Sequence, residues 1–236
     1  MIDLDRAKGG GATEGPHGAA PMLRAGAAPG TAGLGLVLLH GRGGSAADIL
    51  GRARLSGRED LAVLAPEAAG HSWWPVSFLA PMAELQPWLD SALAAVDHAV
   101  AALEAEGLDR TRILVGGFSQ GGCLALEWAA RRGGPLAGLL GFSAGLVGTA
   151  DIAGAAPERA LYGHAPKAMA QAGRLDGVPV WLGCHAEDPH IPRARVEASG
   201  EVLSGLGARV ETALHPGAGH GMTRADVEAL RRMVAG

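Results

Sequence analysis

A serine between glycines, Gly117-Phe118-Ser119-Gln120-Gly121, is the feature of this sequence that most directly indicates chemistry. The apolar run 113–115 precedes it and a helical pattern follows it. A strand, a sharp turn and a helix in this order would hold the Ser119 hydroxyl out at the end of a sheet as a nucleophile. The glycines allow so tight a turn because a bulky Cβ would clash there. The alternative is an ordinary serine in a glycine-rich turn, since the chain has 38 glycines.

A serine hydroxyl is a weak nucleophile at neutral pH, so it needs a base and a group that orients the base. Asp188 follows the apolar run 178–184, and His220 follows the alternating segment 209–214. We therefore predict that Ser119 is the nucleophile, that His220 is the general base and then the general acid, and that Asp188 orients the imidazole.

Acyl transfer through a serine also requires N–H groups that stabilise the oxyanion of the tetrahedral intermediate. The backbone N–H of Gln120, the residue after the serine, is expected to be one donor. The glycine-rich segment 40–45 follows a predicted strand, and the backbone N–H of Arg42 is the best candidate for the other donor. A phosphate-binding loop is the alternative for this segment, but the P-loop spacing is absent.

The elements that must position these residues alternate between strands and helices. Apolar runs predict a short β element near 22–23 and strands at 35–39, 61–64, 112–116, 136–142, 178–184 and 209–214. Helical spacing predicts a short helix from 48, and helices over 84–106, 120–132 and the C-terminal residues from 223, with Pro87 in the first turn of the second. This alternation predicts an α/β fold, with a mostly parallel sheet and helices on both faces.

Five segments that occur in order resemble the phospholipase/carboxylesterase family, which includes the acyl-protein thioesterases. They are 39–43, 65–69, 117–122, 188–192 and 219–220. Gly-Phe-Ser-Gln-Gly, Asp-Pro-x-x-Pro and a late histidine together are much more specific than the serine pattern alone. The segment 73–81 also resembles Trp-x-Pro-x-Ser-Phe-Leu-Ala-Pro of a bacterial serine esterase branch. In that branch another acidic residue often precedes the catalytic acid. Here Glu187 is the nearby alternative to Asp188 for the residue that orients the histidine.

The resemblance implies the α/β-hydrolase fold and, with the three residues above, a serine carboxylesterase that cleaves esters through an acyl-enzyme intermediate. An acyl-thioesterase or a lysophospholipase would use the same residues and remains open. A dienelactone-hydrolase-like enzyme would be expected to carry cysteine in place of Ser119. A non-catalytic protein of this fold that binds a small molecule is the alternative from another class of function.

Four residues are candidates for the substrate pocket: Trp73, Trp74, His190 and Ile191. The tryptophans lie in a proline-flanked loop after a predicted strand, although such a loop could equally pack onto its own domain. The chain has nine histidines, but those near the predicted site match no metal-binding spacing. We therefore expect no metal and no other cofactor. His40 is expected to order the glycine-rich loop rather than to act as a base.

Length and composition predict one α/β domain over residues 17–236, after a flexible segment 1–16. Residues 149–176 are longer and richer in alanine than the fold requires, which makes them a candidate lid or insertion.

The remaining predictions concern surroundings and partners. No apolar run is long enough to span a membrane, and no secretory pattern opens the chain. The net charge of −4 and the absence of a basic stripe argue against nucleic acid as a partner. We expect a cytoplasmic protein that acts on a small-molecule ester or thioester. The resemblance to the family leaves open whether the protein forms a homodimer. Cys123 and Cys184 are expected to be free buried thiols.

Overall fold

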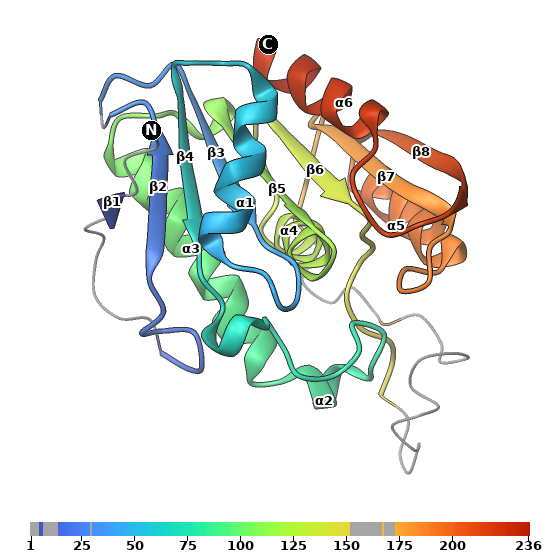
Figure 1. Ribbon diagram of the computed structural model, residues 1–236. Helices are drawn as coiled ribbons and strands as arrows, with labels where there is room; N and C mark the ends of the chain where they lie inside the picture. Colours follow the sequence, from blue (N-terminus) through green and yellow to red (C-terminus); the bar gives the residue numbers. More distant parts are fainter. Residues whose placement is uncertain (1–4, 7–13, 29, 152–166, 168–172) are drawn as a thin grey trace.

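The computed structural model describes residues 5–6, 14–28, 30–151, 167 and 173–236 (Figure 1). Its centre is an eight-stranded sheet in the order β1-β2-β4-β3-β5-β6-β7-β8. The strands are β1 (Asp5–Arg6), β2 (Met22–Gly26), β3 (Leu34–Leu39), β4 (Leu61–Pro66), β5 (Ile113–Phe118), β6 (Gly138–Phe142), β7 (Pro179–Glu187) and β8 (Arg209–Ala218). Strand β2 pairs antiparallel with both neighbours, and all other pairs are parallel. The predicted α/β class with a mostly parallel sheet is confirmed.

Helices cover both faces of this sheet, as predicted. Figure 1 shows α1 (Ala46–Ala53) and α6 (Arg224–Ala235) in front of it and α3 (Trp88–Ala105), α4 (Gln120–Arg132) and α5 (Arg193–Gly205) behind it. The short helix α2 (Met82–Leu85) and the 3₁₀ helices Arg54–Ser56, Ala69–His71 and Arg110–Arg112 lie in the connections.

Successive side chains of the central strands enter the two cores alternately, because strand residues point to opposite faces. In β3, Leu38 packs in the cluster with α1 and α6, whereas Val37 and Leu39 pack in the cluster with α3, α4 and α5. All six residues of β3 are buried, as are all six of β4. These strands are continuous apolar runs because both faces of a parallel sheet are covered.

The long helix predicted over 84–106 is divided in the structure, so its predicted start was wrong. Helix α2 ends at Leu85, Gln86 has the extended backbone angles φ −84° and ψ 149°, and α3 begins at Trp88. Pro87 stands just before α3 instead of in its first turn. Proline disfavours the helical conformation in the residue before it and lacks an N–H, which explains the break.

The turn from β5 into α4 is the tightest feature that bears on function. Ser119 lies between them with φ 54° and ψ −123°, a conformation that side chains rarely adopt. A Cβ on Gly121 would lie 2.3 Å from the carbonyl oxygen of Leu39 and 2.4 Å from that of His40. A Cβ on Gly117 would lie 2.5 Å from the carbonyl carbon of Gly121. Glycine is therefore required at both positions.

Two predicted segments, 1–16 and 149–176, lie mostly outside the described residues. Within them the structure describes 5–6, 14–16, 149–151, 167 and 173–176. Among the described helices, none has the length and apolarity to cross a membrane.

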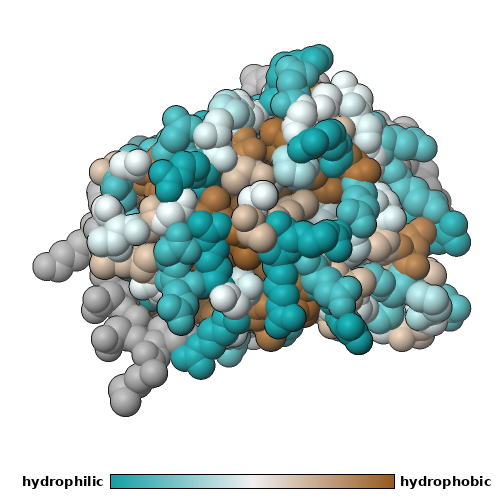
Figure 2. Space-filling view, turned by 90° about the horizontal axis from the view of Figure 1, so that it is seen from above, coloured by the Kyte–Doolittle hydropathy of each residue, from teal (hydrophilic) through white to brown (hydrophobic). Residues whose placement is uncertain are grey.

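The surface offers little continuous apolar area in the view of Figure 2, where hydrophobic residues are interspersed with hydrophilic ones. Leu55 is the only large hydrophobic residue in the described part of the chain that is clearly exposed, at 39%. Isolated exposure of this kind is normal for a folded protein.

Replacing Gly121 with alanine tests the packing of the turn. Because the added Cβ meets two backbone carbonyls, we expect Gly121→Ala to lower the free energy of unfolding by about 1–3 kcal/mol or more. Gly51→Ala in α1 is the matched control: its Cβ meets nothing within 4 Å, and alanine should raise helix stability by up to about 1 kcal/mol. Urea unfolding measures both. Equal stability of Gly121→Ala and the wild type would contradict the packing argument.

Candidate active site

The structure brings together Ser119, His220 and Asp188, the three residues predicted to act as nucleophile, base and acid. The Ser119 Oγ lies 2.9 Å from His220 Nε2, and His220 Nδ1 lies 2.8 Å from Asp188 Oδ2 and 3.1 Å from Asp188 Oδ1. A serine at the N-cap, the position just before a helix, commonly caps the helix with its hydroxyl. Ser119 makes no such bond, so its hydroxyl is directed to the imidazole.

The carboxyl ends of β7 and β8 place the acid and the base side by side. The two strands are parallel and pair up to Glu187 opposite Ala218, so Asp188 and His220 both follow at the same sheet edge. A register shift between His185 and Glu187 comes just before the acid. Such irregularities commonly redirect a side chain next to a functional site. The competing carboxylate, Glu187, is exposed.

The loop that carries His220 is fastened to the sheet by the first turn of α6. Thr223 and Asp226 form a capping box: the Thr223 hydroxyl accepts from the Asp226 N–H, and Asp226 Oδ2 accepts from the Thr223 N–H at 2.7 Å. Asp226 Oδ1 also accepts from Trp181 Nε1 on β7 at 2.8 Å. The start of α6 is thereby tied to the strand that carries Asp188.

The carboxylate of Asp188 is buried and accepts several hydrogen bonds. Its side chain is 0% exposed, and burial alone raises its pKa. Hydrogen bonds from His220 and from the backbone N–H groups of His190 and Ile191, at 2.8 and 3.0 Å, outweigh burial and hold the pKa of Asp188 below its ordinary value. Asp188 is therefore ionised at neutral pH and can hold the imidazole N–H.

A further donor to Asp188 was not anticipated from the sequence. The thiol of Cys184 donates to Asp188 Oδ2 across 3.6 Å. Burial raises the pKa of both Cys184 and Cys123 to about 12, so both remain thiols, and both are free as expected. Only the spacing of four residues between Cys184 and Asp188, next to a strand end, could have indicated this contact.

The two predicted oxyanion donors lie beside Ser119. Arg42 and Gln120 line the same pocket as the serine. Neither backbone N–H makes a hydrogen bond to any residue that the structure describes. Gln120 is the first residue of α4, where N–H groups have no partner within the helix. Both N–H groups are therefore free to bind an oxygen of a substrate.

His40 holds the glycine-rich loop in shape, in agreement with its expected role. Its Nδ1 lies 2.8 Å from the Gly41 carbonyl oxygen, and its Nε2 accepts from the Ala68 N–H at 3.0 Å. The side chain is 2% exposed, and burial lowers the pKa of His40. Both ring nitrogens are thus occupied, which leaves none to act as a base.

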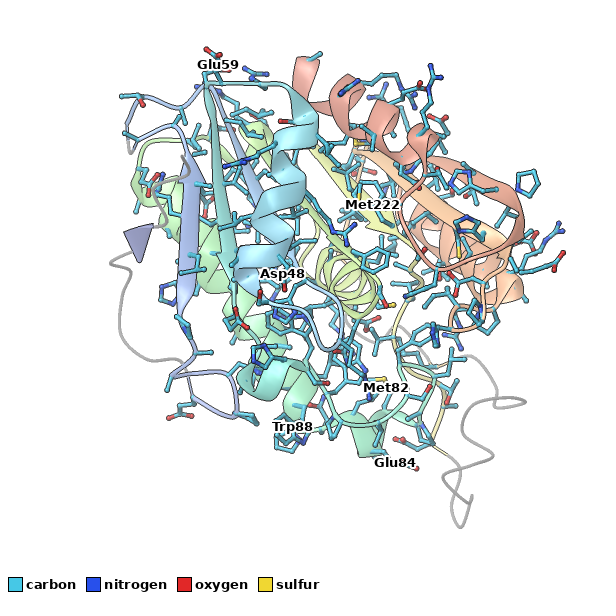
Figure 3. All side chains as sticks on the ribbon, in the orientation of Figure 1. Asp48, Glu59, Met82, Glu84, Trp88 and Met222 are labelled. Atoms are coloured by element: carbon cyan, nitrogen blue, oxygen red, sulfur yellow. The ribbon has the colours of Figure 1, made fainter. Side chains whose placement is uncertain are left out.

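The pocket next to Ser119 has a volume of about 600 Å³. Of the predicted pocket residues, Trp74, His190 and Ile191 line it. Its wall also includes residues that sequence reasoning did not assign to it: Ser77, Phe78, Leu79, Phe118, Cys123 and Pro189. Phe78 and Leu79 come from the loop before α2 and α3; Met82 and Trp88, which start these helices, are labelled in Figure 3.

Trp73 does not line this pocket, so the structure departs from the prediction for that residue. Its side chain is completely buried, and its indole N–H donates to the His40 carbonyl at 2.9 Å. Its ring also packs against those of His17 and His40, with centroids 5.3 and 5.2 Å away. Trp73 is therefore a core residue. Trp74 is completely buried as well, yet it lines the pocket.

His190 stands beside the imidazole of His220. Their rings meet edge to face with centroids 4.7 Å apart, and Phe118 packs on His220 with a centroid distance of 5.0 Å. These contacts restrict the rotation of the His220 ring. Within the described part of the chain, no group of three or more histidine, cysteine, aspartate or glutamate side chains is arranged to hold a metal ion.

Comparison with known proteins relates this fold and site to one family. A family model described as Phospholipase/Carboxylesterase matches residues 32–235. The chain belongs to the phospholipase/carboxylesterase family. The crystal structure of a member from Dyadobacter fermentans is 32% identical in sequence, with a TM-score of 0.83 over 94% of this chain and 99% of that one. The resemblance predicted from the motifs and the α/β-hydrolase fold are thereby confirmed.

Two other proteins are also similar to this chain. The structure of esterase PE8 is 25% identical, with a TM-score of 0.69 over 92% of this chain and 97% of that one. Acyl-protein thioesterase 1 of Gibberella zeae is 33% identical over 114 residues. That match covers 48% of this chain and 43% of the fungal protein, so it spans less than half of either.

The pKa of Asp188 gives a testable dependence of stability on pH in this family member. Its folded-state pKa is lowered, so ionised Asp188 adds stability above its unfolded-state pKa of about 3.9, and this stability is lost as the pH falls through the lower folded value. The difference in unfolding free energy between wild type and Asp188→Asn should therefore shrink on acidification below about pH 4. Urea unfolding across this range measures it.

The neighbouring exposed carboxylate provides the control. Glu187→Gln should change stability far less than Asp188→Asn above pH 4, because Glu187 is exposed. A difference between wild type and Asp188→Asn that stays constant through the acid range would contradict the stabilising role of the ionised carboxylate.

Proposed function

We propose that this protein is a serine carboxylesterase that cleaves carboxylic esters through an acyl-enzyme intermediate. The observation that carries the proposal is the continuous chain of contacts from Ser119 Oγ through the His220 imidazole to Asp188, at 2.9 and 2.8 Å. These are the distances at which a hydroxyl, a base and an orienting carboxylate act together.

The steps follow from the position of each group. Ser119 Oγ attacks the ester carbonyl while its proton passes to His220 Nε2. Asp188 stabilises the resulting imidazolium through Nδ1, without itself taking the proton. The imidazolium then donates its proton to the oxygen of the leaving alcohol. A water molecule activated by His220 releases the acid and restores the serine.

The negative charge that develops on the carbonyl oxygen of the ester must be stabilised by hydrogen-bond donors. In the proposal, the N–H groups of Arg42 and Gln120 bind the oxyanion, where pre-positioned donors stabilise the transition state more than the substrate. The helix dipole of α4 adds partial positive charge at Gln120, its first residue. No step requires a cofactor.

The pocket and the relatives favour a small ester as substrate. A pocket of about 600 Å³ is within the usual range for small-molecule sites. Its wall includes the apolar side chains of Phe78, Leu79 and Ile191. The Dyadobacter relative is described as a phospholipase/carboxylesterase and PE8 as an esterase. We also propose that residues 17–236 form a single domain, that the protein is cytoplasmic, and that it has no nucleic acid partner. Whether it forms a homodimer stays open.

Thioester cleavage is the second candidate, because one relative is an acyl-protein thioesterase. The same serine, histidine and aspartate serve both reactions. A matched panel of 4-nitrophenyl esters and acyl thioesters with increasing acyl length separates the two. We expect a higher kcat/KM with esters than with thioesters of equal acyl length, since two of the relatives are described as a carboxylesterase and an esterase. Highest kcat/KM with long-chain thioesters would assign the protein to the second candidate.

Replacing the nucleophile tests the proposal. Ser119→Ala should lower kcat for a short-chain aryl ester by about 10⁴- to 10⁶-fold, because the three residues act as a unit. Ser204→Ala, an exposed serine in α5, is the matched control and should retain wild-type turnover. Turnover by folded Ser119→Ala within tenfold of the wild type would refute the assignment.

A further inference from the structure

The side chains of Arg42 and Gln120 do something that oxyanion donation does not require: both bind the backbone of one loop, residues 72–76. The Arg42 guanidinium donates to three successive carbonyl groups of this loop. Its Nη1 lies 3.1 Å from the Pro75 oxygen and its Nη2 3.1 Å from the Trp74 oxygen, and Nη2 also donates to the Val76 oxygen.

The side chain of Gln120 binds the same loop. Its Oε1 accepts from the Trp73 N–H at 2.9 Å, and its Nε2 donates to the Trp74 carbonyl at 2.9 Å. Both the oxygen and the nitrogen of the Gln120 side-chain amide therefore bind the loop. The Trp74 carbonyl accepts from Arg42 and Gln120 alike, so one backbone oxygen joins the two side chains.

We propose that loop 72–76 is a positioning clamp, in which the side chains of Arg42 and Gln120 set the spacing of their own backbone N–H groups. The inference rests on the proposed function, because it assigns a purpose to the two oxyanion donors. Arg42 and Gln120 lie 78 residues apart in sequence and on different elements, and the loop connects them directly.

The local backbone explains why such a clamp is needed. Arg42 lies between Gly41 and Gly43, and Gly43 has φ +76°, so no side chain restricts the backbone on either side of Arg42. An oxyanion donor acts only if it lies about 2.7–3.1 Å from the oxyanion, and its benefit depends on being positioned before the reaction. Anchoring the arginine side chain removes freedom from the N–H of the same residue.

The arrangement also argues against a different use for Arg42, as a binding site for an anionic substrate. Two of the nitrogens of its guanidinium already donate to three backbone carbonyls. A carboxylate would have to compete for these donors. Loss of turnover restricted to acidic esters in Arg42 variants would support that alternative and overturn the clamp.

Two variants remove the clamp while they keep the backbone donors: Arg42→Met and Gln120→Met. With a neutral short-chain aryl ester, we expect each to lower kcat by about 10- to 100-fold, less than the loss of an oxyanion donor outright, while KM stays within about threefold. If the two side chains only stabilised the fold, the variants would have a smaller folded fraction, and the folded protein would keep its kcat. Thermal unfolding shows how much protein is folded.

The double variant tests whether the two side chains act through one loop. If they do, Arg42→Met/Gln120→Met should lose clearly less than the product of the two single losses, because the first change already releases the loop. Arg112→Ala is the control, since the hydrogen bonds of its guanidinium to described residues go to the carbonyls of Ala32 and Gly33 and not to loop 72–76. It should keep wild-type kcat. Fully multiplicative losses would overturn a shared clamp.

Chemical rescue supplies a second readout. Arg42 is exposed, so millimolar guanidinium should reach the space vacated in Arg42→Ala and restore part of kcat, with no such gain for Gln120→Ala. Absence of rescue together with wild-type kcat in Arg42→Met would overturn the proposal. Labelling of Ser119 by a fluorophosphonate separates the two hypotheses: a wild type that is not labelled contradicts the proposed function, whereas labelled variants with unchanged kcat contradict only the clamp.

Discussion

The close approach of α4 to the end of β3 is the constraint on which the rest of the site depends. At Gly121 the helix passes so near the carbonyls of Leu39 and His40 that no side chain fits. This contact forces the reversal at Ser119, whose φ of 54° is stabilised by the surrounding hydrogen bonds. The Ser119 N–H donates to the Phe142 carbonyl at 2.8 Å, and the Ser119 carbonyl accepts from Cys123 at 2.8 Å. Ser119 is thus fixed by three neighbouring elements.

The parallel sheet then explains how residues far apart in sequence meet. Because β3, β5, β7 and β8 all run in one direction, their carboxyl ends form one edge, where Arg42, Ser119, Asp188 and His220 follow their strands. Each residue sits in a short connection to the next helix. Burial would disfavour the charge on Asp188, and four donors offset it. The buried negative charge of Asp188 is therefore stabilised by hydrogen-bond donors from the backbone and from two side chains.

Helix α5 was not predicted, because its buried residues include Ser199 and Gly200 and its apolar spacing is weak. The other main helices, the central strands and the residues of the catalytic hypothesis could be predicted from sequence, because apolar runs and glycine-flanked turns are local signals. Contacts that depend on three-dimensional packing could not. The burial of Trp73, the donation by Cys184 and the binding of loop 72–76 all join residues whose proximity no short motif encodes. Sequence spacing indicated where chemistry could occur, and packing decides which neighbours support it.

The most direct test is the intact mass of the protein after treatment with a fluorophosphonate, a reagent that reacts preferentially with an activated serine. The account predicts a single adduct on the wild type and none on the Ser119→Ala variant. An adduct on the variant would place the reactive serine elsewhere. No adduct on folded wild-type protein would contradict an activated Ser119 and would favour a small-molecule-binding protein that performs no catalysis.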